Sequence, residues 1–263
     1  MDGKDIRPCV LTVAGSDSGG NAGIEADLRV MHDFGLHGCV ALTALTAQNP
    51  SGVAAIHNPP PEFVSAQIAA VKGVYDIRAA KTGMLPSKAI IAAAAGALRG
   101  ASFPIVVDPV MIATSGAKLI EDDAVETLEK ELIPLAALIT PNLPEARRLA
   151  RMESEDDAAR LAAALYARFG VPVLVKGGHA EGEMMVDVMF DGKTTVKVAA
   201  RKIENPVSTH GTGCSLSAAI ASCLALGEDL AAAVARAKKY VYCAIRDSYL
   251  VGENCGVLSF ARD

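Results

Sequence analysis

Aromatic side chains are scarce in this chain of 263 residues: they make up 4% of the sequence, and tryptophan is absent. Proteins that bind single-stranded nucleic acids stack the bases on aromatic side chains, so this composition argues against such a surface. A basic excess is also missing, because 25 Lys and Arg residues stand against 30 Asp and Glu residues and leave a formal net charge of −5. We therefore expect no nucleic-acid partner.

Long apolar runs are missing as well. Charges or glycines interrupt the alanine-rich stretches before they reach the roughly 20 residues that span a membrane. The first residues, MDGKDIRP, lack the apolar core of a signal peptide. The six cysteines are scattered, without a CxxC motif or a disulfide-like spacing, which is typical of reduced thiols. We expect a cytoplasmic protein with no membrane partner.

Short apolar runs alternate with longer segments of helical periodicity. The predicted strands are 9–15, 39–47, 77–83, 103–110, 136–142 and 171–178, and the predicted helices are 22–34, 61–72, 87–98, 122–132 and 156–169. This alternation indicates βαβ units, and the nearly continuous apolar strands indicate burial on both faces. The sequence therefore predicts an α/β fold in which helices cover both faces of a mostly parallel sheet.

The pattern changes in the last third of the chain. Residues 183–200 are predicted to form two strands around an Asp-Gly dipeptide, which favours a two-residue hairpin turn and an antiparallel edge of the sheet. Two helices follow, one that opens at the glycines before Cys214 and one from about Leu230 to Tyr249. Because no linker, repeat or low-complexity segment interrupts the sequence, we predict a single domain over residues 1–263.

The polar residues that follow the strands are the first candidates for a site, since ligands of open α/β sheets lie at the carboxyl ends of the strands. AGSDSGGNAGIEAD follows the first strand and places glycines, Gly15 among them, around Asp17. Its spacing is not the GxGxxG of dinucleotide-binding folds, and it predicts either close approach to a ligand or a merely flexible turn. Gln48 and Asn49 end the second strand, where their amides could contact a heterocycle or simply stabilise a turn.

Two carboxylates and an amide follow later strands: Asp108 in VVDPVM, and Asn142 and Glu145 in ITPNLPEA. This set suits a hydrated Mg²⁺ held against phosphates, because Mg²⁺ keeps waters and takes few protein ligands. The alternative for Glu145 is a helix N-terminal carboxylate that the helix dipole favours. Lys176 follows another strand in VLVKGGH, where its ammonium could balance phosphate charge or remain solvated.

The segment HGTGC, from His210 to Cys214, gathers backbone N–H groups where Gly211, Thr212 and Gly213 lead into a helix. Such a turn binds anions, and its field is expected to lower the pKa of the thiol. Cys214 could attack an acyl or disulfide group, although His210 lies across the turn from it, or it could accept the proton of a substrate hydroxyl. The Mg²⁺-suited carboxylates and the lysine favour phosphoryl transfer. The P-loop motif GxxxxGK[ST] is absent, which excludes a P-loop kinase.

The sequence resembles the hydroxymethylpyrimidine/phosphomethylpyrimidine kinases of thiamine biosynthesis, a branch of the ribokinase-like superfamily that also contains pyridoxal kinases. The resemblance rests on AGSDSGGNAGIEADL, ALTAQN, KTGML, VVDPVM, TSG, ITPNLPEA, VLVKGGH and THGTGCSLSAAIA, which occur in family order over nearly the whole chain. It implies a ribokinase-like three-layer sandwich. It also implies a homodimeric, ATP-dependent kinase with Mg²⁺, which phosphorylates 4-amino-5-hydroxymethyl-2-methylpyrimidine and then the monophosphate.

The resemblance further implies a role for each candidate residue. Cys214 occupies the position of the aspartate that deprotonates the substrate hydroxyl in most ribokinase-like enzymes. The remaining implied roles are the anion hole (Gly211, Gly213), contacts to the pyrimidine substrate (Gly15, Asp17, Gln48, Met84, Val110), contacts to the nucleotide phosphates (Thr212, Asn142, Lys176) and metal binding (Asp108, Glu145).

Other interpretations stay open. A pyridoxal or pyridoxine kinase has the same fold and acts on the hydroxymethyl group of a similar ring, and one protein can have both activities. A non-catalytic protein built on a kinase fold is disfavoured by the intact set of Asp108, Glu145, Lys176 and Cys214. A cysteine-dependent acyl or redox enzyme is the remaining alternative.

The chain departs from the family pattern in its substrate-side loops. Asn21 stands where a third consecutive glycine is expected, Glu25 where glutamine is common, and Pro50 where many relatives have threonine. These departures bear on the choice of substrate and leave the catalytic residues intact.

Overall fold

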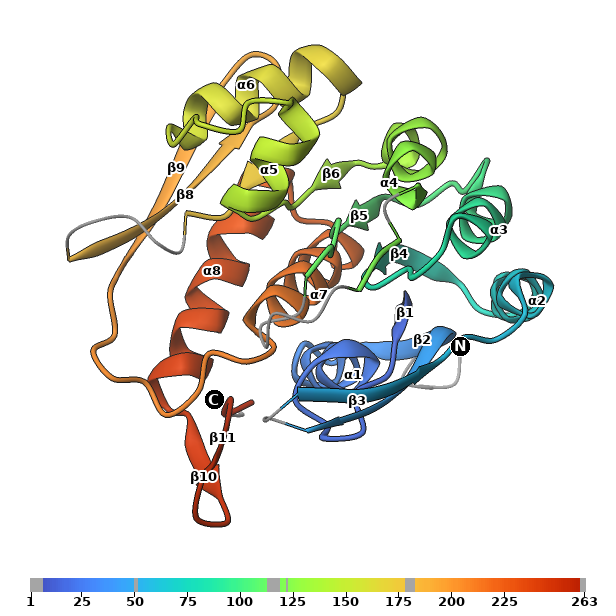
Figure 1. Cartoon of the computed structure of the whole chain (residues 1–263), viewed down its shortest axis with the longest axis horizontal. Coiled ribbons are helices and arrows are strands. Elements are labelled where there is room, and N and C mark those ends of the chain that lie inside the picture. Colours follow the sequence, from blue (N-terminus) through green and yellow to red (C-terminus); the bar gives the residue numbers. More distant parts are fainter. Residues whose placement is uncertain (1–6, 50–51, 113–118, 122, 178–182, 261–263) are drawn as a thin grey trace, which may run out of the picture.

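The computed structural model describes residues 7–49, 52–112, 119–121, 123–177 and 183–260 (Figure 1). A nine-stranded sheet runs through its middle in the order β3-β2-β1-β4-β5-β6-β7-β8-β9. Its strands are β1 Cys9–Gly15, β2 His37–Asn49, β3 Gly52–His57, β4 Ile77–Thr82, β5 Ile105–Val107, β6 Leu138–Ile139, β7 Val173–Val175, β8 Met184–Phe190 and β9 Thr195–Arg201. Strands β2, β1, β4, β5, β6 and β7 pair in parallel, which confirms the predicted mostly parallel sheet.

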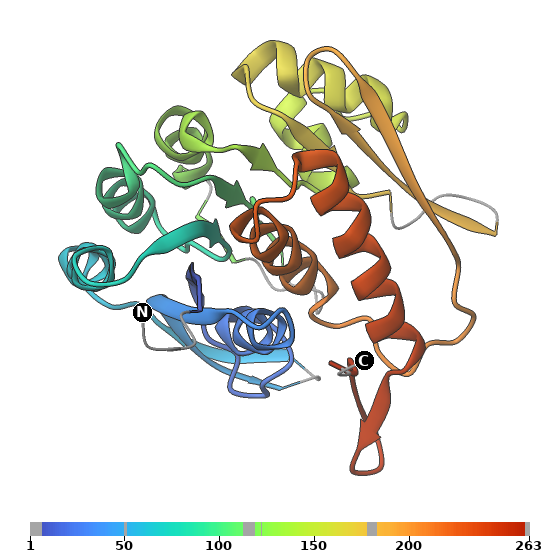
Figure 2. The same cartoon turned by 180° about the vertical axis from the view of Figure 1, so that it is seen from behind.

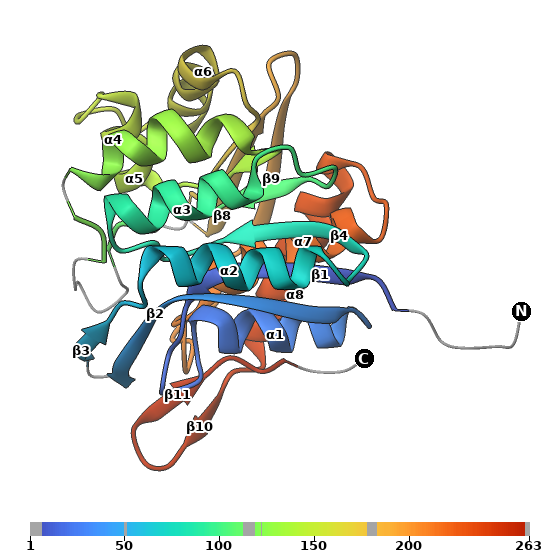
Figure 3. The same ribbon diagram turned by 90° about the vertical axis from the view of Figure 1, so that its right-hand side faces the viewer.

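Helices cover both faces of this sheet (Figures 1 and 3). One layer contains α2 Pro61–Lys72, α3 Lys88–Leu98, α4 Ala124–Thr127 with the π-helix η1 Leu128–Leu132 and the 3-10 helix η2 Ile133–Leu135, α5 Leu143–Ala150 and α6 Ala158–Phe169. The other contains α1 Gly23–Asp33, α7 Thr212–Ala225 and α8 Leu230–Arg246. Helix α7 packs against both α8 and α1, as the view from behind shows (Figure 2). None of the helices in the described ranges is long and apolar enough to cross a lipid bilayer.

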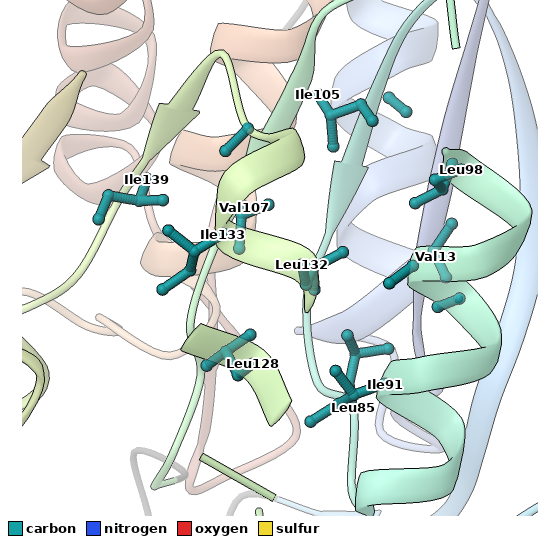
Figure 4. Packing of buried hydrophobic residues seen from close by; sticks show 14 of the residues in the cluster. Val13, Leu85, Ile91, Leu98, Ile105, Val107, Leu128, Leu132, Ile133 and Ile139 are labelled. Atoms are coloured by element: carbon teal, nitrogen blue, oxygen red, sulfur yellow. The ribbon is translucent and has the colours of Figure 1, made fainter. Parts of the chain in front are cut away.

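Two hydrophobic cores form because successive side chains of a strand point to opposite faces. Val107 and Ile139 pack with Leu132 in the core beneath α2 to α6 (Figure 4). Their neighbours along the chain, Val106 and Leu138, belong to the core beneath α1, α7 and α8. All five side chains are fully buried, which explains why the parallel strands are continuous apolar runs in the sequence.

The antiparallel part of the sheet is larger than expected. The predicted hairpin is confirmed as β8 and β9, which pair antiparallel beside β7. A second antiparallel edge was missed: β2 continues to Asn49 and pairs with β3 at the opposite side of the sheet. Most of β3 is exposed, so its sequence lacks the alternation of a half-buried strand.

Two further elements differ from the prediction. Helix α5 was not predicted, although the segment ITPNLPEA that opens it was singled out. Helix α8 ends at Arg246, and Tyr249 instead begins β10 Tyr249–Val251, which forms a separate hairpin with β11 Cys255–Val257. The exposed apolar side chains of β10 extended the helical pattern in the sequence without belonging to the helix.

Candidate active site

A cleft of about 650 Å³ lies at the carboxyl ends of the parallel strands. The residues that follow β1, β4, β5, β6 and β7 all reach it, as the rule for open α/β sheets requires. Every site residue predicted from the sequence lines this cleft: Gly15, Asp17, Gln48, Met84, Asp108, Val110, Asn142, Glu145, Lys176, Gly211, Thr212, Gly213 and Cys214.

The turn before α7 presents backbone N–H groups to the cleft. Gly211 is the N-cap of α7 and has a φ of 85°, a left-handed conformation that favours glycine. A Cβ at this position would collide with the carbonyl oxygen of Asn21, and a Cβ at Gly213 would lie 3.6 Å from Lys176 Nζ and 3.8 Å from Asp108 Oδ2. No side chain caps the helix, so its first N–H groups remain for a ligand. The turn therefore forms an anion site beside a lysine and a carboxylate.

The Cys214 thiol is half-buried in the first turn of α7. The expected lowering of its pKa is wrong. Burial and, to a smaller extent, the carboxylates of Asp27 and Asp108 raise the pKa of Cys214 to about 11, against the lowering effect of Lys81 and a hydrogen bond involving the backbone of Gly23. The protein without ligands thus holds Cys214 as a neutral thiol at neutral pH.

A buried ion pair next to this thiol was missed by the sequence reasoning. Lys81 on β4 and Asp27 on α1 are both 0% exposed, with Nζ 2.9 Å from Oδ2, and the Thr12 hydroxyl donates to the same oxygen at 2.6 Å. Burial alone would lower the pKa of Lys81, but Asp27, Cys214 and Asp108 together outweigh it and raise the pKa above its ordinary value. The signal was a lysine within an otherwise apolar predicted strand, in the motif KTGML.

Asp108 and Lys176 pair at the middle of the cleft. Lys176 Nζ donates to Asp108 Oδ1 at 2.9 Å, and the Thr140 hydroxyl donates to the same oxygen at 3.2 Å. Burial lowers the pKa of Lys176, but the nearby carboxylates of Asp108 and Glu145 raise it above its ordinary value. The lysine is therefore a fixed cation beside the anion site.

Glu145 and Asn142 form a capping box at the start of α5. The Glu145 N–H donates to Asn142 Oδ1 at 2.9 Å, and Glu145 Oε2 accepts from the Asn142 N–H at 2.9 Å. Glu145 Oε1 accepts from the Met111 N–H at 3.2 Å. Burial raises the pKa of Glu145 to about 7, with Lys176 lowering it and Asp108 raising it. The helix N-terminal role that was one interpretation of Glu145 is thus present as a capping box.

The donor set around Asp108 fits a magnesium ion that keeps most of its waters. Within the described residues no group of three or more His, Cys, Asp or Glu side chains could hold a metal. Mg²⁺ needs no such cage, since one or two carboxylates together with substrate phosphates suffice. Asp108 Oδ2 lies near the anion turn, and a cation there would relieve the cost of ionising the buried Glu145.

Asp17 organises the loop at the other end of the cleft. Its carboxylate accepts from the N–H groups of Gly19 at 2.8 Å, Asn21 at 3.0 Å and Ala22 at 2.9 Å. His210 Nε2 lies 3.3 Å from Asp17 Oδ2 and 3.4 Å from Gln48 Nε2. His210 was not assigned a site role from the sequence, yet it lines the cleft and joins the two predicted substrate residues.

Two of the departures from the family pattern can be placed. Glu25 accepts from the Asp17 N–H at 2.8 Å and so supports the same loop. Asn21 is buried, and its backbone contacts the Gly211 turn. Pro50 lies outside the described residues, as does the motif TSG at 114–116.

The cleft extends further than predicted, toward β8 and α8. Lys238 on α8 donates to Asp187 Oδ2 on β8 at 2.7 Å, and Asp187 Oδ1 accepts from the Gly177 N–H at 2.9 Å. Leu216, Val241, Ile245 and Met185 line the same part of the cleft. This part of the cleft is apolar around one ion pair, and no sequence motif marks it because its residues come from three elements.

Comparison with known proteins identifies the family. A family model described as phosphomethylpyrimidine kinase matches residues 17–259. This chain belongs to the phosphomethylpyrimidine kinase family. A hydroxymethylpyrimidine/phosphomethylpyrimidine kinase of Rhizobium meliloti (strain 1021) is 47% identical over 94% of this chain and 94% of its own. The thiamine biosynthesis bifunctional protein ThiED of Geobacter sulfurreducens is also 47% identical, over 95% of this chain and 51% of its own length.

Solved structures agree with the ribokinase-like fold expected for this family. An ADP complex of Bacillus subtilis pyridoxal kinase superposes with a TM-score of 0.88 at 34% identity, over 97% of this chain and 98% of that one. A phosphomethylpyrimidine kinase from Clostridium difficile 630 gives 0.78 at 38% identity, over 90% and 98%. The chain is therefore a kinase, and the prediction of phosphoryl transfer is confirmed.

Proposed function

We propose that this kinase transfers the γ-phosphoryl group of ATP to the hydroxymethyl group of 4-amino-5-hydroxymethyl-2-methylpyrimidine, and a second phosphoryl group to the product. The observation that carries the proposal is the position of Cys214, which stands in an anion-binding turn beside Lys176 and Asp108. Gln48, Met84 and Val110 line the same cleft and would contact the pyrimidine ring.

The nucleotide would occupy the part of the cleft toward α8. Leu216, Val241 and Ile245 supply an apolar surface for the adenosine, and the turn at Gly211 and Gly213 would receive the phosphates. Lys176 would pair with the phosphate charge. Asp108 would hold hydrated Mg²⁺ with Glu145, and the bound ion would neutralise charge on the transferring phosphoryl group.

Transfer forms a bond between the substrate oxygen and the γ-phosphorus and breaks the bond between the γ-phosphorus and the bridging oxygen of ADP. The hydroxyl proton would pass to the Cys214 sulfur, which must first be a thiolate to accept it. Because the raised pKa leaves mainly thiol at neutral pH, only a minor fraction of the protein is ready for this step. The fixed turn and Lys176 would supply most of the stabilisation of the transferring group.

A pyridoxal kinase is the second candidate, favoured by the close superposition on the Bacillus subtilis enzyme. ATP consumption measured separately with the pyrimidine alcohol, its monophosphate and pyridoxal decides between the two. We expect a higher kcat/KM for the pyrimidine alcohol than for pyridoxal, and turnover of the monophosphate. A preference for pyridoxal would overturn the proposal. The homodimer that the resemblance implies and the cytoplasmic location that the composition favours stay predictions, which light scattering and cell fractionation would test.

A further inference from the structure

The terminal amide of Gln48 lies between two polar groups whose hydrogens can be assigned. Gln48 Nε2 lies 3.4 Å from His210 Nε2, and Gln48 Oε1 lies 3.5 Å from Thr46 Oγ1. A half-turn of the amide about its last torsion exchanges the oxygen and the nitrogen without changing the shape of the side chain. The hydrogen-bonding capacity of Thr46 and His210 therefore decides which orientation is satisfied.

Thr46 favours the nitrogen of Gln48 on its side. The Thr46 hydroxyl has one hydrogen, and it donates this hydrogen to the Ser16 carbonyl oxygen at 2.8 Å. Toward Gln48 the same hydroxyl can only accept. An amide NH₂ facing Thr46 makes a hydrogen bond, whereas an amide oxygen there faces lone pairs.

His210 favours the oxygen of Gln48 on its side. The Asp17 carboxylate accepts three backbone N–H groups. Although burial raises the pKa of Asp17, the hydrogen bond from His210 and those from the loop outweigh it and hold the pKa below its ordinary value. An ionised carboxylate has no hydrogen to give, so the hydrogen between Asp17 and His210 belongs to His210 Nε2. That N–H can be shared with an amide oxygen, and it would repel an amide NH₂.

We propose that Thr46 and His210 hold the Gln48 amide with its oxygen toward His210 and its nitrogen toward Thr46, which makes His210 a specificity-determining residue. This inference rests on the proposed function, in which Gln48 contacts the substrate ring. The negative charge of Asp17 fixes the hydrogen on His210 Nε2, and this hydrogen in turn sets the orientation of the Gln48 amide.

The direction of that amide matters for substrate choice. A 4-aminopyrimidine offers an amine donor beside a ring-nitrogen acceptor, and the 4-oxo analogue offers the reverse, a carbonyl acceptor beside a ring N–H donor. A glutamine that is free to turn can pair with either edge, since its amide carries both a donor and an acceptor. A glutamine held in one direction pairs with one edge only, so His210 lets the site distinguish the amino from the oxo compound.

The kinetic test compares kcat/KM for 4-amino-5-hydroxymethyl-2-methylpyrimidine with that for its 4-oxo analogue. We expect a ratio on the order of ten to a hundred in the unmodified protein, typical of a two-bond amide contact. His210→Leu and Thr46→Val should each reduce this ratio by roughly fivefold or more, because the amide becomes free to turn. His57→Leu, at an exposed position on β3, is the matched control and should leave the ratio unchanged.

The same substitutions are then made in a Gln48→Met background, which has no amide to orient. There His210→Leu should leave the amino-to-oxo ratio unchanged. An unchanged ratio in both single variants, or an equal decrease with and without the amide, would overturn the proposal. The second pattern would mean that His210 acts on the substrate without Gln48.

The orientation of the Gln48 amide can also be observed in the ligand-free protein, independently of which substrate the kinase uses. Long-range ¹H–¹⁵N spectra of the ligand-free protein should give Nε2 of His210 the shift of a protonated nitrogen. The Gln48 NH₂ protons should show a nuclear Overhauser effect to the Thr46 methyl group. An unprotonated Nε2, or amide protons that contact His210 instead, would refute the orientation even if the pyrimidine is the substrate. If the pyrimidine is not a substrate, these spectra still decide the orientation.

Discussion

The reactivity of Cys214 should depend steeply on pH. Its thiol has a pKa raised by burial to about 11, so at pH 7 about one molecule in 10⁴ carries the thiolate. Each pH unit multiplies this fraction by about ten, which gives about a hundredfold increase between pH 7 and 9. Because alkylating reagents and the substrate proton both require the thiolate, alkylation and phosphoryl transfer should share this dependence.

The assay labels the ligand-free protein with iodoacetamide at several pH values and follows the peptide that contains Cys214 by mass spectrometry. In parallel, kcat is measured over the same range for the unmodified protein and for Cys214→Asp and Cys214→Ala. We expect kcat of the unmodified protein to rise with pH. Cys214→Asp should show a flat profile, because its carboxylate is ionised throughout, and should recover part of the roughly 10²- to 10⁴-fold loss expected of Cys214→Ala.

Nucleotide binding supplies an internal control. Phosphates in the turn bring negative charge close to the thiol, so ADP should slow alkylation further by raising the same pKa. Fast labelling of Cys214 at pH 7 that does not increase toward pH 9 would show that the turn stabilises a thiolate after all. Trapping a phosphorylated or acylated cysteine would refute the role as a base, as would full activity of Cys214→Ala.

Substitutions at three other positions, one of them combined with a second change, test the rest of the site. Gln48→Ala should raise KM for the pyrimidine alcohol by an amount equal to roughly 1–3 kcal/mol with little change for ATP, and an unchanged KM would remove Gln48 from the site. Glu145→Gln should increase the Mg²⁺ concentration needed for half-maximal kcat. Between the ordinary pKa of 4.5 and the folded value of about 7, Glu145 keeps its proton in the folded protein and has lost it in the unfolded chain. The free energy of unfolding therefore falls as pH rises through this window, by at most about 3 kcal/mol. Glu145→Gln should remove that decrease, which urea unfolding at pH 5 and pH 8 would measure. The same change in the free energy of unfolding between the two pH values in both proteins would contradict the raised pKa of Glu145. Lys81→Met should slow alkylation of Cys214 several-fold, since Lys81 lowers the pKa of that thiol, and should destabilise the protein by about 3–5 kcal/mol by leaving Asp27 unpaired. Adding Asp27→Asn should restore most of that stability but only part of the reactivity, because Asp27 raises the pKa of the thiol by less than Lys81 lowers it. Full recovery of the reactivity together with the stability would mean that Lys81 acts through the fold alone.

The parallel sheet and the location of the cleft could be predicted because both follow from local pattern. Apolar runs mark strands buried on two faces, and the strand-end rule then brings distant polar residues to one edge. That rule placed Asp108 and Lys176 in one cleft, although they are 68 positions apart, and they form an ion pair there.

The features that could not be predicted depend on burial and on partners that are distant in sequence. The helix N-terminus suggested an acidic thiol at Cys214, but desolvation exceeds the effect of the turn. Lys81 and Asp27 are 54 positions apart, and no short motif connects them. Strand β3 could not be recognised because most of its side chains are exposed, so pairing with β2 rather than burial determines its conformation.

The contact between Gly211 and Asn21 has a consequence for how the family can vary. The turn touches the backbone carbonyl of Asn21 and not its side chain, so any Cβ at Gly211 is excluded while the residue type at position 21 is not fixed by this contact. Among the described residues, the non-glycine positions with positive φ are Arg151 and Asn205, so the backbone of Asn21 does not call for glycine either. This contact therefore restricts the residue type at position 211 and not at position 21, and an insertion in either loop would have to be matched by a change in its neighbour.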